Sequence, residues 1–411
     1  MFMAVMIKYL FFPVRMRFSL LFSRLYNIIE VVRFMIYLDN CATTKVYKEA
    51  MDAALHAFEE TYANPSSIHK AGFLLRNDFE EARSVIKKFL NIESGEIIFT
   101  SCASEANNII VNSIKDIKKK KILTTAVEHQ AMNKPIDNLV ANGFEVTKIH
   151  PKGGQITLDD VLAKLDDGFG FVSLMHVNNE VGSIIDVEGI AREVKRLYPD
   201  IIFATDAVQA FGKLRIDLSE GNIDFLSMSG HKVHAPKGIG CLYACDMNLV
   251  KPLIYGGEQE FSLRAGTENV PGVLALAEAV KILDKNLENN YKYVSDLKNK
   301  MIESLKELDG VHLHSEGEGY SPYVLSVAFD NIKAEVLVHI LEQDEVYIST
   351  SSACSSKQKK HRRVLEGYGY SEKEAEETVR ISFSEMNTEE EVLKAAELIK
   401  KAVKFIRSVK K

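Results

Sequence analysis

The segment SMSGHKVHAPKGIG (227–240) joins the end of an apolar run to a lysine and a loop rich in turn residues. The run IDFLSMS (223–229) has the length and composition of a buried strand, and Pro and Gly follow Lys232 closely. Lysine is seldom buried without a partner. Because burial lowers the pKa of an amine, a lysine at the end of a buried strand can act as a nucleophile or a base. A lysine at the start of an exposed loop fits these residues equally well.

Six more apolar runs have the length and composition of buried strands. They are EIIFTS (96–101), KILTTA (121–126), FEVTKIH (144–150), FVSLMHV (171–177), IIFATD (201–206) and IGCLYA (239–244). Helical patterns lie between them, such as VEGIAREVKRLY (187–198), whose apolar residues share one face. This alternation predicts an α/β fold with a mostly parallel central sheet and helices on both faces. The ligand site of such a sheet lies at the carboxyl ends of its strands.

The last third of the chain has the pattern of a second unit. A long helical pattern covers residues 276–309, and the strand-like runs VHLHS (311–315) and YVLSVAF (323–329) follow it. The last helix opens with Thr388 and Glu391 in the spacing of a capping box. Its apolar stripe consists of Val392, Ala396, Ile399, Val403 and Ile406.

Two further strand ends carry groups with a chemical use. Asp206 ends the run 201–206, where an acid can pair with the protonated ring nitrogen of pyridoxal phosphate (PLP) or cap the next helix. Asp206 precedes Lys232 by 26 residues, and two such residues at two strand ends indicate a PLP site more specifically than either residue alone. In IIFTSCASEANNII (97–110) a strand passes into a helix, whose amino end suits a phosphate or is simply capped by a serine.

The composition limits the kind of protein. A formal net charge of −6 argues against a general nucleic-acid binder, and the charged and apolar fractions are ordinary for a globular protein. The five cysteines form no Cys-x-x-Cys pair, so a disulfide framework is not expected. A reducing compartment, and so a cytoplasmic location, is predicted.

Residues 1–34 differ from the rest of the chain because they carry five basic residues against one acid, Glu30. Their apolar runs are too short for a spanning helix, which needs about 20 residues, so no membrane association through a span is expected. The segment is either a presequence or membrane-surface helix, or the product of a misplaced start, with Met35 as the real first residue.

Ten sequence motifs follow one another in the same order as in one protein family, and together they extend from residue 36 to about 400. The chain resembles the cysteine desulfurases of the NifS/IscS type, which belong to the class-V aminotransferase group of fold-type I PLP enzymes. The motifs are YLDNCATT (37–44), NPSSIH (64–69), TSCASEANN (100–108), EHQA (128–131), MHVNNEVG (175–182), TDAVQAFGK (205–213), SMSGHKVHAPKGIG (227–240), RAGTEN (264–269), SSACSS (351–356) and VRISFS (379–384).

The resemblance implies a fold-type I PLP-dependent transferase with two domains. The large PLP-binding domain would cover residues 47–290. A smaller α+β domain would combine residues 35–46 with residues 291–411 and carry the loop of the catalytic cysteine. Residues 1–34 would form an extension outside both domains.

The resemblance also assigns the residues around the cofactor ring. Lys232 aligns with the lysine that binds PLP covalently, and Asp206 with the partner of the pyridine nitrogen. Gln209 aligns with the residue that bonds the phenolic oxygen. His129 aligns with the histidine that stacks on the ring and is the candidate for moving protons near the substrate thiol.

Phosphate and substrate residues follow from the same resemblance. The phosphate would be held by Ala103, Ser104, Ser229, His231, and Thr267 of a second subunit. Thr267 therefore implies a homodimer with shared active sites. Asn179 and Arg380 align with residues that hold the substrate carboxylate, a task that suits a guanidinium fork. Asn179 is also expected beside the cofactor.

Cys354 specifies the implied reaction. It lies in a polar stretch beside basic residues, where a thiol can be largely ionised, although a passive loop cysteine fits the local sequence as well. The family reaction converts L-cysteine to L-alanine and leaves a persulfide on this cysteine. The sulfur would pass to an acceptor protein in iron–sulfur cluster assembly or tRNA thiolation. No intrinsic metal site and no direct nucleic-acid contact are expected, although Cys354 could ligate an iron–sulfur cluster transiently.

Some positions depart from the family pattern. Cys102 replaces a glycine, so the backbone there must avoid positive φ. Cys41 replaces Asn or Ser, and a second redox-active thiol near the pocket is an open alternative, whereas Cys241 and Cys245 are expected in the core. The basic stretch 357–363 is either a solvated face or a docking patch. Alternative functions are another PLP lyase or aminotransferase reaction, selenocysteine lysis included, and a sulfur-relay scaffold.

Overall fold

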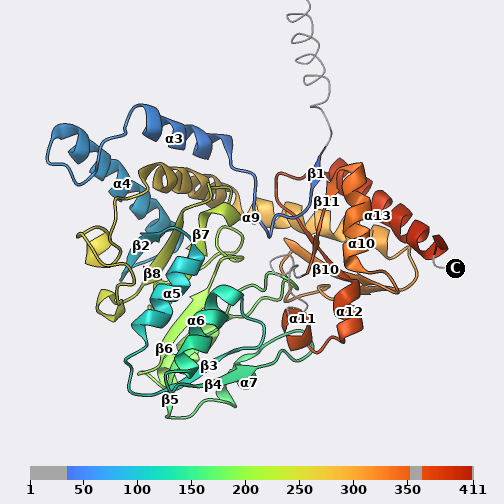
Figure 1. Ribbon diagram of the computed structural model, residues 1–411, viewed down its shortest axis with the longest axis horizontal. Helices are drawn as coiled ribbons and strands as arrows, with labels where there is room; N and C mark the ends of the chain where they lie inside the picture. The colour runs from blue at the N-terminus through green and yellow to red at the C-terminus, as the bar shows by residue number, and fades with distance from the viewer. Residues whose placement is uncertain (1–34, 352–362, 410–411) are drawn as a thin grey trace, which may run out of the picture.

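The computed structural model describes residues 35–351 and 363–409 (Figure 1). Residues 1–34 and 352–362 lie outside the described part of the chain. The predictions for the N-terminal extension, for Cys354 and for most of the basic stretch fall on these residues.

A seven-stranded sheet forms the larger part of the molecule, in the order β2-β8-β7-β6-β5-β3-β4 (Figure 1). Its strands are β2 (Glu96–Thr100), β3 (Lys121–Thr125), β4 (Glu145–Ile149), β5 (Phe169–Ser173), β6 (Ile202–Asp206), β7 (Phe225–Ser229) and β8 (Gly240–Ala244). Only β8 runs antiparallel to its neighbours, so the mostly parallel sheet is confirmed. β5 ends earlier than predicted, although Leu174 and His176 still donate backbone bonds to the β6 carbonyls.

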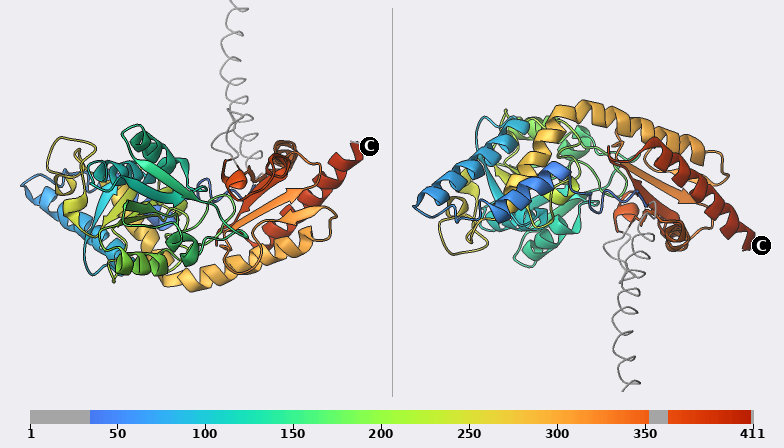
Figure 2. Two further views of the ribbon diagram at one scale, coloured as in Figure 1. Left: turned by 90° about the horizontal axis from the view of Figure 1, so that it is seen from below. Right: turned by 90° about the horizontal axis from the view of Figure 1, so that it is seen from above.

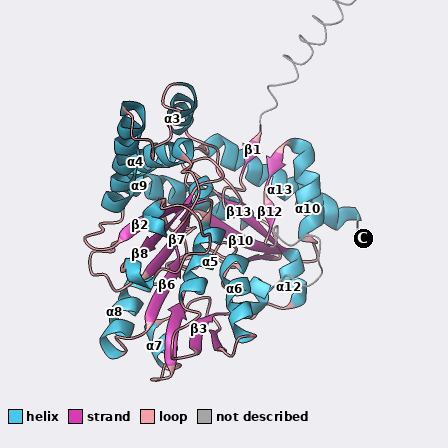
Figure 3. Ribbon diagram, turned by 60° about the vertical axis from the view of Figure 1, so that its left-hand side comes forward, coloured by secondary structure: helices cyan, strands magenta, loops and turns pink. Residues whose placement is uncertain are grey.

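Helices cover both faces of this sheet, as predicted (Figure 3). Alternate strand residues point to opposite sides, so Ile97 and Phe99 pack in one apolar cluster and Ile98 in the other. The first cluster includes α3 (Lys48–Glu59), α4 (Lys70–Phe89), α7 (Leu158–Leu162), α8 (Val187–Leu197) and part of α9 (Val270–Leu305). The second includes α5 (Ala103–Ser113) and α6 (Gln130–Val140).

A smaller antiparallel sheet has the order β12-β13-β10-β9. Its strands are β9 (Val311–Leu313), β10 (Val324–Phe329), β12 (Ser349–Thr350) and β13 (Thr378–Ser382). The helices around it are α10 (Ala334–Leu341), α11 (Arg363–Gly367), α12 (Glu372–Glu377) and α13 (Glu389–Val409). Beside it, β1 (Ile36–Tyr37) pairs with β11 (Val346–Tyr347), so the first described residues join the last third of the chain (Figure 1).

The long helix α9 connects the two parts (Figure 2). Leu287 packs in the first apolar cluster of the large sheet, whereas Val294, two turns later, packs in the core of the small sheet with Ile36 and Leu38. The domain boundaries drawn from the sequence stay a prediction, and this changeover supports a boundary near residue 290.

The last helix has its predicted amino end. The Thr388 backbone donates to Glu391 Oε2 at 3.0 Å, and the Glu391 backbone donates to Thr388 Oγ1 at 3.1 Å, which completes the capping box. All five residues of the predicted apolar stripe are buried. In the described ranges, no helix has the length and apolarity that crossing a membrane requires.

Candidate active site

Lys232 lies directly after the end of β7. The strand ends at Ser229, and residues Gly230–Lys232 form a single 3-10 turn. The Lys232 Nζ donates to the carbonyl oxygens of Cys41 and Ala42, at 2.6 and 2.7 Å. The amine therefore points at the segment that follows β1 rather than into solvent, so the predicted strand-end position is observed and the exposed-loop alternative is wrong.

Asp206 ends the neighbouring parallel strand, β6, and is 3% exposed. Its Oδ2 accepts from Asn107 Nδ2 at 2.9 Å, and its Oδ1 accepts from the Val208 backbone at 3.0 Å. Since Asp206 pairs in register with Ser227 of β7, it and Lys232 lie at the same edge of the sheet. Two bonds from neutral donors hold the carboxylate in one orientation.

His129 caps the amino end of α6. Its Nδ1 accepts from the Ala131 backbone at 3.1 Å, so in a neutral imidazole the proton is on Nε2. Burial lowers the pKa of His129, Asp206 opposes that change, and Lys232 adds to it. The histidine is thus within electrostatic reach of both strand-end residues, and it is mostly neutral at pH 7.

Gln209 links the segment after β6 to the carbonyl that binds Lys232. Its Nε2 donates to the Cys41 oxygen at 3.1 Å, and its Oε1 accepts from Lys213 Nζ at 2.9 Å. Gln209 and Lys213 are both buried. Cys41 therefore contributes to the site through its backbone carbonyl, which accepts from two side chains.

The amino end of α5 provides the predicted phosphate position. Ala103 is buried and Ser104 is exposed in its first turn. Cys102 before it has φ −175° and ψ 170°, an extended backbone that any residue adopts, so the predicted avoidance of positive φ is confirmed. A Cβ at Gly240 of β8 would lie only 2.8 Å from the Cys102 Cα, which explains why a glycine is needed there.

Two more predicted phosphate residues come from the end of β7. The Ser229 Oγ is buried and has no hydrogen-bond partner in the described part of the chain. The His231 Nδ1 lies 3.2 Å from Thr43 Oγ1. Burial and the nearby Lys232 lower the pKa of His231 to about 4, so its ring is neutral at pH 7.

Arg380 comes from the other sheet, in the middle of β13. Its Nη1 donates to the Asn179 carbonyl at 3.0 Å, and its Nη2 donates to Asp39 Oδ1 at 2.7 Å. Within the described residues, neither the Arg380 Nε nor the Asn179 Oδ1 has a hydrogen-bond partner, although both atoms are buried. The two predicted substrate residues are therefore together, with donor and acceptor capacity left unused.

Thr267 is exposed in the loop before α9. The same loop is held to α5 by the Arg264 Nε, which donates to Glu105 Oε1 at 2.8 Å. The assignment of Thr267 to the site of a second subunit stays a prediction.

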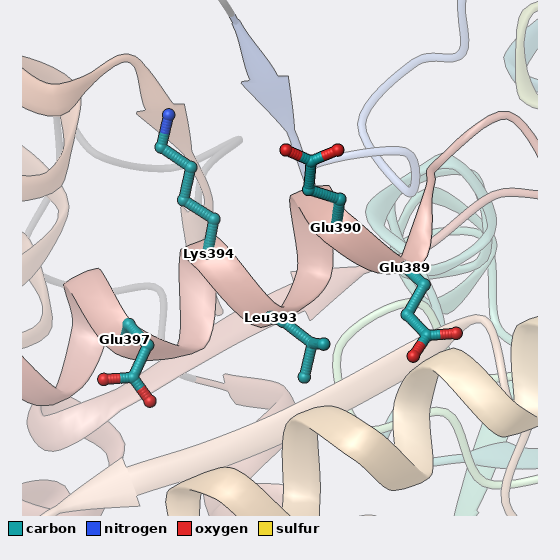
Figure 4. Close-up of a pocket in the computed structure, with 5 residues that line it drawn as sticks. All are labelled: Glu389, Glu390, Leu393, Lys394 and Glu397. Carbon is teal, nitrogen blue, oxygen red and sulfur yellow. The ribbon is translucent and has the colours of Figure 1, made fainter.

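The collected groups suit a phosphorylated pyridine. The carboxylate of Asp206, the amine of Lys232 and the neutral imidazole of His129 lie at the same edge of the sheet. These groups suit the ring of PLP, which needs a lysine amine and an acid beside its ring nitrogen. The unpartnered Ser229 hydroxyl and the α5 amino end suit its phosphate. By contrast, the hollow lined by Glu389, Glu390, Leu393, Lys394 and Glu397 on α13 contains none of the predicted site residues (Figure 4).

The comparisons with known proteins agree with this geometry. The family model described as Aminotransferase class-V matches residues 36–394. The chain belongs to the class-V aminotransferase family. It is 37% identical to a NifS/IcsS protein homolog of Lactobacillus delbrueckii subsp. bulgaricus, over 87% of this chain and 94% of that protein. It is 35% identical to cysteine desulfurase IscS of Methanosarcina thermophila, over 91% and 93% of the two chains. The solved structure of a NifS-like protein matches with a TM-score of 0.84 and 34% identity, over 91% and 100% of the chains. The predicted resemblance and fold class are confirmed.

The site contains residues that the sequence analysis missed. Asp39 binds Arg380, and the Cys41 carbonyl binds Lys232, although the motif that contains both was recognised. Two carboxyls also adjoin the site, that of Glu128, which is buried, and that of Glu180, which is half-buried. Burial raises the pKa of Glu128 to about 8 and that of Glu180 to about 8. One indication of both residues was present in the sequence, because Glu128 directly precedes His129 and Glu180 directly follows Asn179.

A second group that the sequence analysis missed joins the two parts of the molecule. Glu385, shortly after β13, accepts from the Tyr47 hydroxyl and lies 3.0 Å from His234 Nε2. The Tyr47 and His234 rings stack with centroids 4.3 Å apart. Burial alone would raise the pKa of Glu385, but the bonds from His234 and Tyr47 lower it to about 2. A charged carboxylate thus ties the end of β13 to the loop of Lys232.

The cysteine predictions are only partly met. Cys241 is fully buried in the core, as predicted. Cys245 is only partly buried, and its Sγ lies 3.6 Å from the Gly221 carbonyl. None of the described cysteines, Cys41, Cys102, Cys241 and Cys245, forms a disulfide bond.

Proposed function

We propose that this chain is a PLP-dependent cysteine desulfurase that converts L-cysteine to L-alanine and receives the sulfur on Cys354. The observation that carries the proposal is the convergence of Asp206, His129 and Lys232 at one sheet edge, with Arg380 reaching the site from the other sheet. The similarity to proteins named cysteine desulfurase over about nine-tenths of the chain supports the same activity.

The cofactor would be held by groups already placed in the structure. Asp206 would face the ring nitrogen, Gln209 the phenolic oxygen and His129 the ring. Ser229 and the amino end of α5 would hold the phosphate. When bound, PLP supplies an electron sink that stabilises negative charge at the substrate Cα.

The chain's own residues then orient the substrate and move its protons. The Arg380 guanidinium binds the carboxylate of L-cysteine, and its unused Nε offers a further donor. Lys232, with its amine free, would take the Cα proton as a general base. Neutral His129 carries its proton on Nε2, because Nδ1 accepts from the Ala131 backbone, so it can donate that proton near the substrate sulfur and take it back afterwards.

Cys354 completes the reaction as the sulfur acceptor. Its thiolate attacks the substrate sulfur, a sulfur–sulfur bond forms, and the substrate carbon–sulfur bond breaks. The electron pair of that bond stays on the carbon fragment, which is protonated to L-alanine. L-cysteine and one thiol thus become L-alanine and one persulfide, with no external oxidant or reductant.

The proposal includes a homodimer and a protein acceptor. Exposed apolar side chains on α3, namely Met51, Leu55 and Phe58, support a contact with a second copy. The persulfide would be passed to an acceptor in iron–sulfur cluster assembly or tRNA thiolation, and the location would be cytoplasmic. The alternative is a scaffold that has no catalytic activity. Turnover of L-cysteine by the purified protein without any partner would exclude this alternative.

Substitution of Cys354 tests the proposal. Cys354→Ala should keep the visible absorbance of bound PLP but release no alanine from L-cysteine, because the sulfur acceptor is missing. Cys245→Ala, which removes a partly buried thiol elsewhere, is the matched control and should retain turnover. Normal alanine release from Cys354→Ala would remove this cysteine from the mechanism.

A further inference from the structure

A second lysine, Lys213, lies buried next to the site. Its side chain is 6% exposed, and its Nζ donates to Gln209 Oε1 at 2.9 Å. The Tyr323 ring centroid lies 5.6 Å from the same nitrogen. No step of the proposed reaction uses Lys213. Because burial of a cation costs free energy unless its surroundings compensate, the position of this lysine requires an explanation.

The backbone is shaped to bring Lys213 to Gln209. A turn over residues 207–213 follows β6, and Gly212 has φ 73°. A Cβ at Gly212 would lie 2.9 Å from side-chain atoms of Leu283 and Val233, so only glycine fits there. The turn places the Lys213 amine on the amide that lies four residues earlier in the chain.

The contact fixes which way the Gln209 amide faces. An ammonium group only donates hydrogen bonds, so it requires the amide oxygen on its side. The Nε2 then faces the Cys41 carbonyl, to which it donates at 3.1 Å, and Lys232 donates to the same carbonyl at 2.6 Å. A flipped amide would set N–H groups against the Lys213 ammonium and an oxygen against the Cys41 oxygen.

We propose that Lys213 is a positioning residue that holds the Gln209 amide with its donor end toward the phenolic oxygen of the cofactor. This inference rests on the proposed function, because Gln209 meets a phenolic oxygen only if the site binds PLP. The ammonium also polarises the amide, which strengthens the bond that its N–H donates. Lys213 thereby acts on the cofactor ring without touching it. Cys41, Glu385 and Arg380 are the other polar groups whose charge acts on Lys213, and burial itself lowers its pKa.

The test compares neutral and charged replacements of Lys213 in the full chain. PLP is titrated into the apoprotein to measure its affinity, and the visible absorbance of the loaded resting enzyme is recorded. Lys213→Met should weaken PLP binding by about tenfold, the scale expected for a lost hydrogen bond to a charged group, and shift the absorbance. Lys213→Arg, which keeps the charge and the donors, should stay within about threefold of the wild type.

A double-substitution cycle separates positioning from packing. In a Gln209→Leu background the lysine has no amide to hold, so Lys213→Met should change PLP affinity by less than about twofold. An undiminished effect in that background would overturn the inference, as would a Lys213→Met protein with the PLP affinity and spectrum of the wild type.

Folding and the proposed function are controlled separately. Lys213→Gln provides a second neutral variant, and thermal melting shows which variants fold. If both neutral variants unfold while Lys213→Arg folds, the lysine serves the core and the inference is overturned. A wild-type protein that binds no PLP contradicts the proposed function itself, whereas a yellow wild type with indistinguishable Lys213 variants contradicts only the inference.

Discussion

At the edge of the seven-stranded sheet, Asp206 and Ser229 are the last residues of β6 and β7, and Lys232 follows three residues later. In the four-stranded sheet, by contrast, Arg380 is the middle residue of β13, between two apolar neighbours. A polar residue at the end of a strand can be recognised from the adjacent sequence, because it directly follows a run of apolar residues. The burial of Arg380 inside a strand cannot be recognised in this way, because its partner Asp39 lies 341 residues away in the chain.

The two regions also differ in how their polar groups are stabilised. Asp206 is held by neutral donors at an edge where a ligand can enter. Arg380, 4% exposed, forms an ion pair with Asp39. A buried ion pair adds little net stability, yet loss of one partner is costly. We therefore expect substitution of Lys232, in the first region, to affect chemistry alone and substitution of Arg380, in the second, to affect both binding and folding.

The largest effect is expected from Lys232→Ala. Alanine release from L-cysteine should fall by at least about 10³-fold, because general acid–base catalysis alone contributes about 10²–10⁴-fold. The melting temperature should stay close to that of the wild type, since the side chain is only partly buried. Lys285→Ala, at an exposed position on α9, is the control and should be fully active. Alanine release within tenfold of the wild type would remove Lys232 from the reaction.

Arg380→Lys should have the next largest effect. The charge is kept, but the planar fork that binds a carboxylate and Asp39 together is lost. We expect kcat/KM for L-cysteine to fall by about 10²-fold, mainly through KM, and the melting temperature to fall with it. Arg192→Lys, in an exposed ion pair with Glu220, is the matched control. A variant with an unchanged KM would show that Arg380 supports the fold and does not bind substrate.

A smaller, pH-dependent effect is expected from two carboxyls beside the site, Glu128 near Asp206 and Glu180 near Arg380. The pKa of Glu128 and that of Glu180 are both raised to about 8 by burial. A raised carboxyl pKa contributes stability that is present below the unfolded pKa of about 4.3 and is lost as pH rises through 8. Urea unfolding should therefore show Glu128→Gln and Glu180→Gln gaining stability over the wild type between pH 5 and pH 8.

The two gains should be similar in size. Burial raises the pKa of Glu128 and that of Glu180 to about 8, so the two carboxyls are linked to stability over the same pH range. Glu303→Gln, at an exposed position on α9, should show no such pH dependence. No gain in either variant would mean that the two carboxyls are not held as neutral acids.

The smallest effect is expected from Cys41→Ala. Only the backbone carbonyl of Cys41 binds Lys232 and Gln209, and the substitution leaves that carbonyl in place. Turnover should stay within about threefold, with a loss of about 1 kcal/mol in stability for the buried thiol. A loss of turnover comparable to that of Cys354→Ala would instead assign Cys41 a role as a second reactive thiol.

The sequence predicted the regular part of the fold well, because most β-strands of the large sheet are short apolar runs between turn residues, although the edge strand β4 (EVTKI) is largely polar and only partly buried. It also placed Asp206 and Lys232 together, since neighbouring parallel strands end at one edge. The sequence did not reveal that Lys213 is buried, because a lysine after Gly212 looks like an exposed turn residue. Nor did it show that the Cys41 carbonyl receives two side chains, since a backbone contact leaves no trace in residue type.

The most direct test of the central claim is one assay on the purified full chain. The visible absorbance is recorded, L-cysteine and dithiothreitol are added, and alanine and sulfide are measured without any partner protein. The account predicts a yellow protein that releases alanine and sulfide in equal amounts. A yellow protein that releases neither would contradict the proposed desulfurase activity, and a colourless protein would contradict the assignment of the Lys232 edge as a PLP site.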